Sequence, residues 1–466
     1  MISRTDLNER VREWGLREDI IEKDYVIGWL LWGIGSNPRL SASWAFKGGT
    51  CLKKCYLETY RFSEDLDFTV LPDGPIKLDE VMPLLQEIFG RVYEQVGIDF
   101  RIRPATLRMR PDTKSAEGRV YYRGPRNAPD VASIKLDLTE SEQVIRPTVL
   151  RHISHPYPDQ LASPATVRCY SFEELFAEKL RAMGQRSRPR DLYDIINLFR
   201  RKEFRPHAEL IRSVYVQKCE SKGVEIFALS SLENSPYRVE LETEWANMLG
   251  HQLPVLPPFE DFWRELPHLF DWLDGRLAPE ELMPISFADG EERGWSPPPT
   301  VWVWGQRVPL ESVRFAAANH LCVELGYGGS KRLIEPYSLR RTKDGYLLLY
   351  AVKIETGELR AHRVDRIQSI QVTNTTFRPR YPIEFTSVGS LVAPLTQKAG
   401  GLSASSKPSK SGTVYVFECG YCGKRFKRWT YDTHLRPHKD KDGVFDCPGR
   451  VGYEVDRHYE RISGRP

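Results

Sequence analysis

Two aspartates and a glycine-rich turn lie close together near the start of this 466-residue chain. The turn is Gly48–Thr50, and the aspartates, Asp65 and Asp67, are separated by one residue. A Gly-Gly-Thr turn that opens a helix lets backbone N–H groups approach phosphate oxygens closely. Because side chains alternate along a strand, Asp65 and Asp67 would share one face, where they could hold the Mg²⁺ ions of a nucleoside triphosphate. The alternative is a tight turn followed by a solvated strand edge.

A third carboxylate is needed to complete such a metal site and to orient an attacking hydroxyl group. Asp137 is the candidate, because it is the lone acid among the strand-forming residues of Ile134–Leu138. Taken alone, Asp137 also fits an ordinary solvated position on a strand. Together with Asp65 and Asp67, it predicts a site for nucleotidyl transfer.

A second group of charged residues occurs between positions 171 and 198. Lys179 lies on an expected helix that begins at Ser171–Glu174, a sequence with the pattern of a capping box. Arg190 and Asp191 open the next expected helix. A lysine and arginines near triphosphate oxygens would neutralise the charge that develops on the leaving pyrophosphate. Each residue also has a purely structural explanation, which for Asp191 is the dipole of the helix that it begins.

Taken in order, these segments resemble the AbiEii family of toxin nucleotidyltransferases, within the polymerase-β-like superfamily. The resemblance extends over about residues 15–275. Its motifs are Lys47-Gly48-Gly49-Thr50, then Arg61-Phe62-Ser63-Glu64-Asp65-Leu66-Asp67-Phe68, then Lys135-Leu136-Asp137-Leu138, then Glu174-Leu175-Phe176-Ala177-Glu178-Lys179, and last Arg186 with Arg190-Asp191-Leu192-Tyr193-Asp194. Ordered motifs are much more specific than any one of them alone.

The resemblance implies transfer of a nucleotide from an NTP to an acceptor, and several relatives modify the 3′ end of tRNA. Lys179 would contact the triphosphate, and Asp191 would be a catalytic or a site-shaping acid. The implied residues are Asp65, Asp67 and Asp137 for Mg²⁺; Lys47, Gly48, Gly49, Thr50 and Arg190 for the NTP; and Asp65, Asp67, Asp137, Lys179 and Asp191 for catalysis. The acceptor itself is not indicated by any residue.

An α+β multidomain fold would position these residues. Periodicity predicts helices within 6–35 and at about 79–96, and strands near 98–109, 118–123 and 131–138. With the strand–turn–helix–strand unit at 44–70, these form a polymerase-β-like nucleotidyltransferase sheet followed by a helical part. The expected transferase domain is 1–280, with its catalytic sheet at about 40–150 and its helical part at about 170–275.

Composition and charge are those of an ordinary globular protein. The net charge is +4, and 41% of the residues are hydrophobic. The polar N-terminus is not a signal peptide, and the longest apolar run, Tyr25–Gly35, is about half of a membrane span. Five cysteines are scattered along the first 322 residues, so they do not indicate a disulfide scaffold. We therefore expect a reduced, cytoplasmic protein with no membrane partner.

Cysteines and histidines cluster near the C-terminus, in the expected module 414–466. Cys419 and Cys422 precede His434 and His438, a ligand set that suits tetrahedral Zn²⁺. The pattern resembles a C2H2 zinc finger with its ββα fold, although the gap between the pairs is one residue short, and Cys447 could replace one histidine. The surrounding Lys, Arg, Trp and Tyr residues suit a module that grips nucleic acid, and a module that contacts protein fits the same residues equally well.

Short strands are expected between residues 301 and 390, bounded by linkers at 281–300 and 391–413. The segment Phe315–Val372 resembles the WYL domain of bacterial regulators, which implies a small Sm-like β-barrel that binds a ligand or nucleic acid. Its signature Trp-Tyr-Leu is altered to Tyr346–Tyr350. Several arginines could form an anion-binding face or be solvated: Arg340, Arg341, Arg360, Arg363 and Arg366.

The sequence thus favours a nucleotidyltransferase toxin or phage-defence effector that modifies RNA, with an RNA 3′-OH, as in tRNA, as the acceptor. The C-terminal modules, or a separate antitoxin, would restrain or direct it. One alternative is a ligand-responsive, nucleic-acid-binding regulator whose nucleotide-binding core does not turn over. The other is nucleotidylation of a protein hydroxyl.

Overall fold

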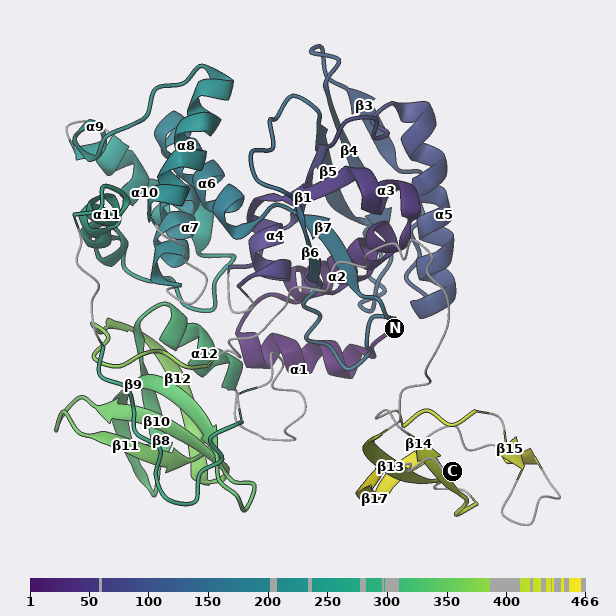
Figure 1. Cartoon of the computed structure of the whole chain (residues 1–466), viewed down its shortest axis with the longest axis vertical. Coiled ribbons are helices and arrows are strands. Elements are labelled where there is room, and N and C mark those ends of the chain that lie inside the picture. The colour runs from purple at the N-terminus through teal and green to yellow at the C-terminus, as the bar shows by residue number, and fades with distance from the viewer. Residues whose placement is uncertain are drawn as a thin grey trace. The chain divides into compact units, whose positions relative to one another are not determined.

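The computed structural model describes residues 1–57, 61–201, 208–233, 237–276, 282–295, 297, 310–385, 411–419, 422–428, 433–436, 438–439, 446–447 and 452–461 (Figure 1). Within it, the chain forms two compact units, Met1–Leu395 and Thr396–Pro466. The boundary falls inside the expected linker 391–413, most of which lies outside the described residues. None of the helices among the described residues combines the length and the apolar character needed to cross a bilayer.

A mixed seven-stranded sheet is the centre of the first unit. In spatial order its strands are β3 (Thr106–Met109), β4 (Ser115–Tyr122), β5 (Ala132–Thr139), β2 (Asp65–Val70), β1 (Trp44–Lys47), β7 (Thr166–Cys169) and β6 (Val149–His152). The pairs β2–β5 and β1–β7 are parallel, and the others are antiparallel. This mixed α/β architecture agrees with the expected fold class of the core.

Strand register brings the polar residues of three strands into one row. Lys47 pairs with Asp67, and Asp67 pairs with Asp137 on the next strand. Side chains that are directly opposite one another point to the same face of a sheet, and so do residues two apart on a strand. Asp65, Asp67 and Asp137 therefore share one face, as the sequence predicted.

The helices of the sheet region are α1 (Arg4–Trp14), α2 (Glu18–Ser36), α3 (Pro38–Ser43), α4 (Gly48–Cys55) and α5 (Leu78–Val96). Most residues of α2 are buried, which explains why its sequence is apolar on more than one side. A buried ion pair joins α2 to α4, where Lys54 Nζ lies 2.7 Å from Asp24 Oδ2. Tyr157 donates a second hydrogen bond to the same oxygen.

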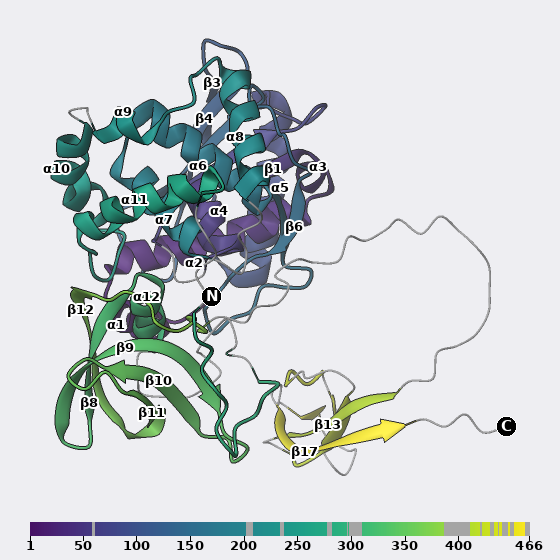
Figure 2. The ribbon, with the colours of Figure 1, turned by 60° about the vertical axis from the view of Figure 1, so that its left-hand side comes forward.

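Six helices form the part that faces the sheet across the site: α6 (Phe172–Arg186), α7 (Pro189–Arg200), α8 (Ala208–Lys222), α9 (Leu229–Glu233), α10 (Tyr237–Leu249) and α11 (Phe259–Leu273). Figure 2 shows them gathered beside the sheet. Ser171 caps α6 through Oγ. Glu174 does not complete the expected capping box, because its carboxylate accepts the backbone N–H groups of residues 145 and 146 and pairs with Lys218 at 2.6 Å.

A helix and five strands follow within the same unit: α12 (Leu310–Ala318), β8 (Leu321–Tyr327), β9 (Ser330–Arg341), β10 (Leu347–Lys353), β11 (Leu359–Arg363) and β12 (Ile367–Thr376). The sheet order is β11-β10-β9-β8-β12, so the last strand lies beside the first. Ser312 of α12 donates to the carbonyl of Glu13 at 2.7 Å, and Tyr193 donates to Asn319 at 2.8 Å. This β domain is thus attached to α1 and α7; its WYL-like identity stays a prediction.

The expected linker 281–300 is ordered against this β domain over residues 282–295. Ile285 is buried, and its carbonyl accepts a hydrogen bond from Arg340 at 2.7 Å. Glu291 is buried as well, accepts from the Tyr350 hydroxyl and forms a bridge with Thr342. Residues 282–295 of the expected linker thus pack on this sheet through an apolar residue and an acid within a polar stretch. The remainder of that linker lies largely outside the described residues.

The second unit is a β structure. It contains β13 (Ser411–Cys419), β14 (Arg425–Arg428), β15 (His438–Lys439), β16 (Asp446–Cys447) and β17 (Gly452–Arg461), with a sheet in the order β14-β13-β17. Its described residues include no helix, so the ββα expectation is corrected. Between the two histidines, residues 435–436 are described without a helix, and His438 and Lys439 form the short strand β15.

Candidate active site

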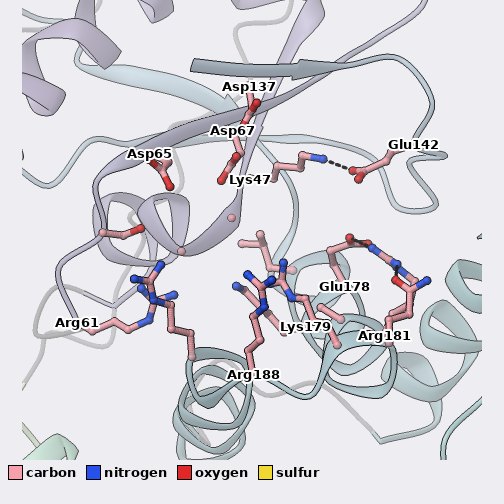
Figure 3. Close-up of a pocket in the computed structure, with 18 of the residues that line it drawn as sticks. Lys47, Arg61, Asp65, Asp67, Asp137, Glu142, Glu178, Lys179, Arg181 and Arg188 are labelled. Carbon is pink, nitrogen blue, oxygen red and sulfur yellow. Dashed lines mark hydrogen bonds and ion pairs between the residues drawn. The ribbon is translucent and has the colours of Figure 1, made fainter. Parts of the chain in front are cut away.

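A pocket of about 430 Å³ lies between the acidic face of the sheet and helices α6 and α7. Figure 3 shows acids reaching into it from the strands and cations from the helices. The residues that line it are Lys47, Gly48, Gly49, Arg61, Ser63, Asp65, Asp67, Lys135, Asp137, Glu142, Leu175, Glu178, Lys179, Arg181, Ala182, Gln185, Arg186, Arg188 and Arg190. The tertiary fold therefore brings together Asp65, Asp67, Asp137, Lys179 and Arg190, as the sequence predicted.

Two glycines allow the α4 turn to approach the other side chains of the pocket. Gly48 has φ +81°, and a Cβ atom there would lie 2.4 Å from Asp67 Oδ2. A Cβ atom on Gly49 would lie 2.6 Å from Arg61 Nη2. A larger residue would displace the Asp67 carboxylate or the buried Arg61 guanidinium, so space favours glycine at both positions. At Gly48 the positive φ favours glycine as well.

Burial makes the charged form of the central acids costly. It raises the pKa of Asp67 to about 6, an effect that Lys47 opposes and that Asp65 and Asp137 reinforce. Burial also raises the pKa of Asp65. Carboxylates whose charges are destabilised by burial and by each other are suited to a divalent cation, which reverses both effects.

Asp137 is held by two cations beside the pocket. Arg110 Nη2 lies 2.8 Å from Asp137 Oδ1, and Lys135 Nζ lies 2.6 Å from Oδ2. Lys135 belongs to the same strand, whereas Arg110 follows β3, two strands away in the sheet. Neither contact was predicted. Arg110 reaches Asp137 only because β3 and β5 lie in one sheet, whereas Lys135, two residues before Asp137 on one strand, shares its face through the period of the strand.

Lys47 is turned toward Glu142, with which it forms an ion pair (Figure 3). Glu142 follows β5 and also accepts a hydrogen bond from Thr69 at 3.3 Å. Glu142 was not predicted, because it lies in a polar loop segment without a motif. An incoming phosphate would compete with it for Lys47.

A buried cluster of ion pairs fixes the helices against the sheet. Arg61 is 3% exposed and donates to both carboxylate oxygens of Asp194, at 2.8 and 3.0 Å. Lys179 Nζ lies 2.7 Å from the same carboxylate, and burial lowers the pKa of Lys179 to about 8. Arg61 comes from the loop after α4, Lys179 from α6 and Asp194 from α7. The cluster therefore sets the width of the pocket.

Two predicted residues are absent from the described lining of the pocket. Asp191 is fully buried and accepts from Arg186 at 2.8 Å through both oxygens. Burial raises its pKa, but the hydrogen bonds from Arg186 and the charge of Lys179 bring the pKa below its usual value. Thr50 is 1% exposed and donates through its hydroxyl to the Asp65 carbonyl. Asp191 thus orients Arg186, and the Thr50 side chain holds β2.

A sequence profile of the family described as "Nucleotidyl transferase AbiEii toxin, Type IV TA system" matches residues 29–273. The match covers more than half of the 466 residues and includes all of the pocket. The chain belongs to the AbiEii family. Among solved structures, it is similar to the nucleotidyltransferase toxin MenT4 from Mycobacterium tuberculosis H37Rv, with a TM-score of 0.41 and 20% identity over 59% of this chain and 90% of that one. No curated protein matches the sequence.

The C-terminal cysteines lie outside the part that matches the AbiEii profile, and they form a separate cluster. Ligand atoms of Cys419, Cys422, His438 and Cys447 all lie within 4.8 Å of one another. The His438 Nδ1 atom lies 2.9 Å from the Arg436 carbonyl, a contact that leaves Nε2 to face Cys422 at 3.5 Å. His434 is exposed and is not one of the four, and Cys447, the substitute that the sequence analysis kept open, is. The β15–β16 pair brings Cys447 directly opposite His438.

We predict that Arg61→Ala destabilises the AbiEii core by about 3–5 kcal/mol, because Asp194 would keep a buried charge with one partner fewer. Guanidinium titration of the full chain, followed by near-UV circular dichroism, measures this loss. Arg188→Ala is the matched control: Arg188 lines the same pocket but is exposed, so its removal changes the free energy of unfolding by about 0.5 kcal/mol or less. Equal stability of both variants would contradict the structural role of Arg61.

Proposed function

We propose that this AbiEii-family chain transfers a nucleotide from an NTP to a hydroxyl group of RNA, with the 3′ end of tRNA as the acceptor. The observation that carries the proposal is the opposition of one acidic sheet face to one cationic helix face across a single pocket. A metal–triphosphate complex needs negative side chains around its metal ions and positive side chains around its phosphates. Carboxylates supply the first, and lysine and arginine supply the second.

Asp65, Asp67 and Asp137 would hold Mg²⁺ when it is bound. The fit rests on their shared face, on the close approach that Gly48 permits and on the raised pKa of Asp67. Bound there, Mg²⁺ would supply positive charge to the phosphate oxygens and to the acceptor oxygen.

Lys179, Arg188 and Arg190 would bind the phosphates from the opposite side of the pocket. The acceptor hydroxyl gives up its proton to solvent as its oxygen forms a bond to the α-phosphorus, and the bond from that phosphorus to the bridging oxygen of pyrophosphate breaks. The charge that develops on pyrophosphate is neutralised by these cations, which are already in position. Arg186, oriented by Asp191, adds a further cation on the same side. In this arrangement Asp191 is a positioning residue.

The sheet face that carries the acids continues into a basic surface, which favours a nucleic acid as acceptor. Lys135 pairs with Arg119, and Arg119 pairs with Thr106 on the edge strand. Arg108 lies opposite Glu117 and next to Arg110. We call Arg108, Arg110, Arg119 and Lys135 the β3–β5 basic surface. Its side chains share the face of Asp65 and Asp137, so a polyanion bound there would lead directly to the metal site.

Two cations of this surface, Arg110 and Lys135, also pair with Asp137, so the surface is coupled to the metal site. Mg²⁺ at Asp137 would replace Arg110 and Lys135 as the partners of the carboxylate. The two cations would then be released toward the phosphates of an RNA strand. RNA that binds Arg110 and Lys135 would free Asp137 for Mg²⁺, and Mg²⁺ at Asp137 would free the two cations for RNA. Acceptor binding and metal binding would therefore support each other.

Two alternatives remain for the same fold. A regulator with a non-catalytic core would bind NTP and nucleic acid without transfer, and a protein-modifying enzyme would label a protein hydroxyl. The β3–β5 basic surface favours RNA over a protein acceptor. The intact row of three acids favours turnover over simple binding.

The appended modules would restrain or direct the transferase, together with an antitoxin partner that the toxin family implies. The WYL-like β domain would sense a ligand, but four of the five arginines expected on its anion-binding face already have partners within the protein. Arg340 is buried against backbone carbonyls, and the others with described ion pairs contact acids: Arg341 with Glu292, Arg360 with Glu358 and Arg363 with Asp365. Trp429 and Tyr431, expected to contact nucleic acid, lie outside the described residues.

The transfer reaction is tested by incubating the full chain with each α-³²P-labelled NTP, Mg²⁺ and total tRNA. We expect label in RNA, and a loss of about a hundredfold or more in Asp65→Asn, because several kcal/mol of metal-borne stabilisation disappear. Asp79→Asn, an exposed change in the first turn of α5, is the matched control and keeps the activity.

The site of the label decides between the alternatives. Loss of labelling after periodate oxidation of the tRNA 3′ end supports the proposed acceptor. Label on protein alone supports protein nucleotidylation. Label on neither, with tight nucleic-acid binding, supports the regulator.

The β3–β5 basic surface is tested by the double variant Arg108→Glu/Arg119→Glu. We expect at least a tenfold higher KM for tRNA with an unchanged Kd for NTP, and a salt dependence of tRNA binding that falls by about 0.7 in log–log slope per lost phosphate contact. Arg212→Glu/Arg264→Glu, on exposed positions of α8 and α11, is the control. Equal effects of the two pairs would show that net charge, and not this surface, attracts RNA.

We also propose Zn²⁺ at Cys419, Cys422, His438 and Cys447, where it would fasten the small C-terminal sheet. Chelation should lower the thermal stability of the C-terminal unit, and Cys422→Ser should remove about one zinc per chain, as measured by inductively coupled plasma mass spectrometry. His434→Ala is the matched control that separates this ligand set from the C2H2 set. Loss of zinc in His434→Ala would contradict the proposed set.

A further inference from the structure

Three cysteines that are scattered in the sequence meet in the core, directly behind the active-site turn. Cys51 and Cys55 lie one turn apart on α4, and Cys169 ends β7. The register of β7 beside β1 places Cys169 opposite Phe46, immediately before the turn that opens α4. The three Sγ atoms all lie within 4.8 Å of one another. None of the three residues is more than 1% exposed.

The surroundings of the three thiols are not purely apolar. Arg151 of β6 is 5% exposed and donates to the Cys55 carbonyl at 3.0 Å, with its guanidinium 4.3 Å from the centre of the Tyr56 ring. The Tyr56 hydroxyl lies 3.9 Å from Cys169 Sγ. Arg151 therefore brings a buried positive charge to the backbone of Cys55, in the part of the core where the three thiols meet.

We propose that Cys51, Cys55 and Cys169 form a buried site for a thiophilic d¹⁰ cation, Zn²⁺ or Cu⁺. Thiolate sulfur prefers such ions over Mg²⁺, so this site and the carboxylates of the pocket would select different metals. Binding would replace up to three thiol protons with one metal ion. With Zn²⁺, the three thiolates and the metal carry a net charge of −1, which the buried guanidinium of Arg151 balances.

The position of the site links it to the phosphate-binding turn. Cys51 follows Thr50, so a metal bound to Cys51, Cys55 and Cys169 would tie α4 to β7 just behind Gly48 and Gly49. The metal would hold the turn in place without facing the pocket. Metal binding by the three cysteines does not depend on the proposed nucleotidyl transfer, so an experiment can contradict either proposal without the other.

The test uses the full chain with Cys419→Ser/Cys422→Ser, so that the C-terminal cluster does not contribute metal. Purified from medium supplemented with zinc or copper, this protein should contain about one equivalent of Zn²⁺ or Cu⁺, and the metal recovered distinguishes the two ions. Adding Cys51→Ser should remove it. Adding Cys322→Ser, a change at a buried cysteine of β8 outside both clusters, should not. Less than about 0.1 equivalent of either metal, or content unchanged by Cys51→Ser, would overturn the proposal.

A second measurement needs no change at the three cysteines. Co²⁺ added to the metal-free Cys419→Ser/Cys422→Ser chain should produce thiolate-to-cobalt charge-transfer absorption. Zn²⁺ should slow alkylation of Cys51, Cys55 and Cys169 by iodoacetamide at least tenfold, as followed by peptide mass spectrometry, while alkylation of Cys322 is unchanged. No charge-transfer band and equal alkylation with and without metal would show that the thiols only fill the core.

Discussion

The buried contacts of Asp194 with Arg61 and Lys179 are the interaction on which the site depends. The acids of the pocket belong to the sheet and its cations to α6 and α7, so neither half forms a site alone. Arg61, from the sheet side, and Lys179, from the helical side, meet on one carboxylate at 2.7 to 3.0 Å. Because an unpaired charge is costly in the core, the two halves are held at the separation that keeps all three groups paired.

The acids and cations of the site differ in role. Asp65, Asp67 and Asp137 line the pocket in one row, where we propose that they hold metal, while Asp191 and Asp194 pair with cations and are absent from the described lining. The same distinction applies to the glycine turn, where Gly48 and Gly49 make room and the Thr50 hydroxyl secures β2. Motif membership therefore does not reveal which residues touch substrate. Burial and hydrogen bonding separate the two roles.

The AbiEii core carries additions that differ in how they are attached. The β domain is part of the first compact unit, in which Ser312 of α12 donates to α1 and Asn319, the residue after α12, accepts from Tyr193 of α7. The C-terminal sheet is a unit of its own, with a Cys/His cluster in place of a large hydrophobic core. A small sheet of this kind is stabilised when a metal joins its strands and loops.

Local pattern was enough to predict α4, β2, α5 and β5 and to single out Asp65, Asp67, Asp137 and Lys179, because periodicity and turn residues act over a few positions. Strand pairing and helix docking lie beyond such patterns. They placed Arg110 on Asp137, Glu142 on Lys47 and three scattered cysteines in one cluster. They also decided between two ligands that the sequence left open, because the β15–β16 pair brings Cys447 beside His438. The first three contacts join residues that are far apart in the sequence, so no local pattern could indicate them.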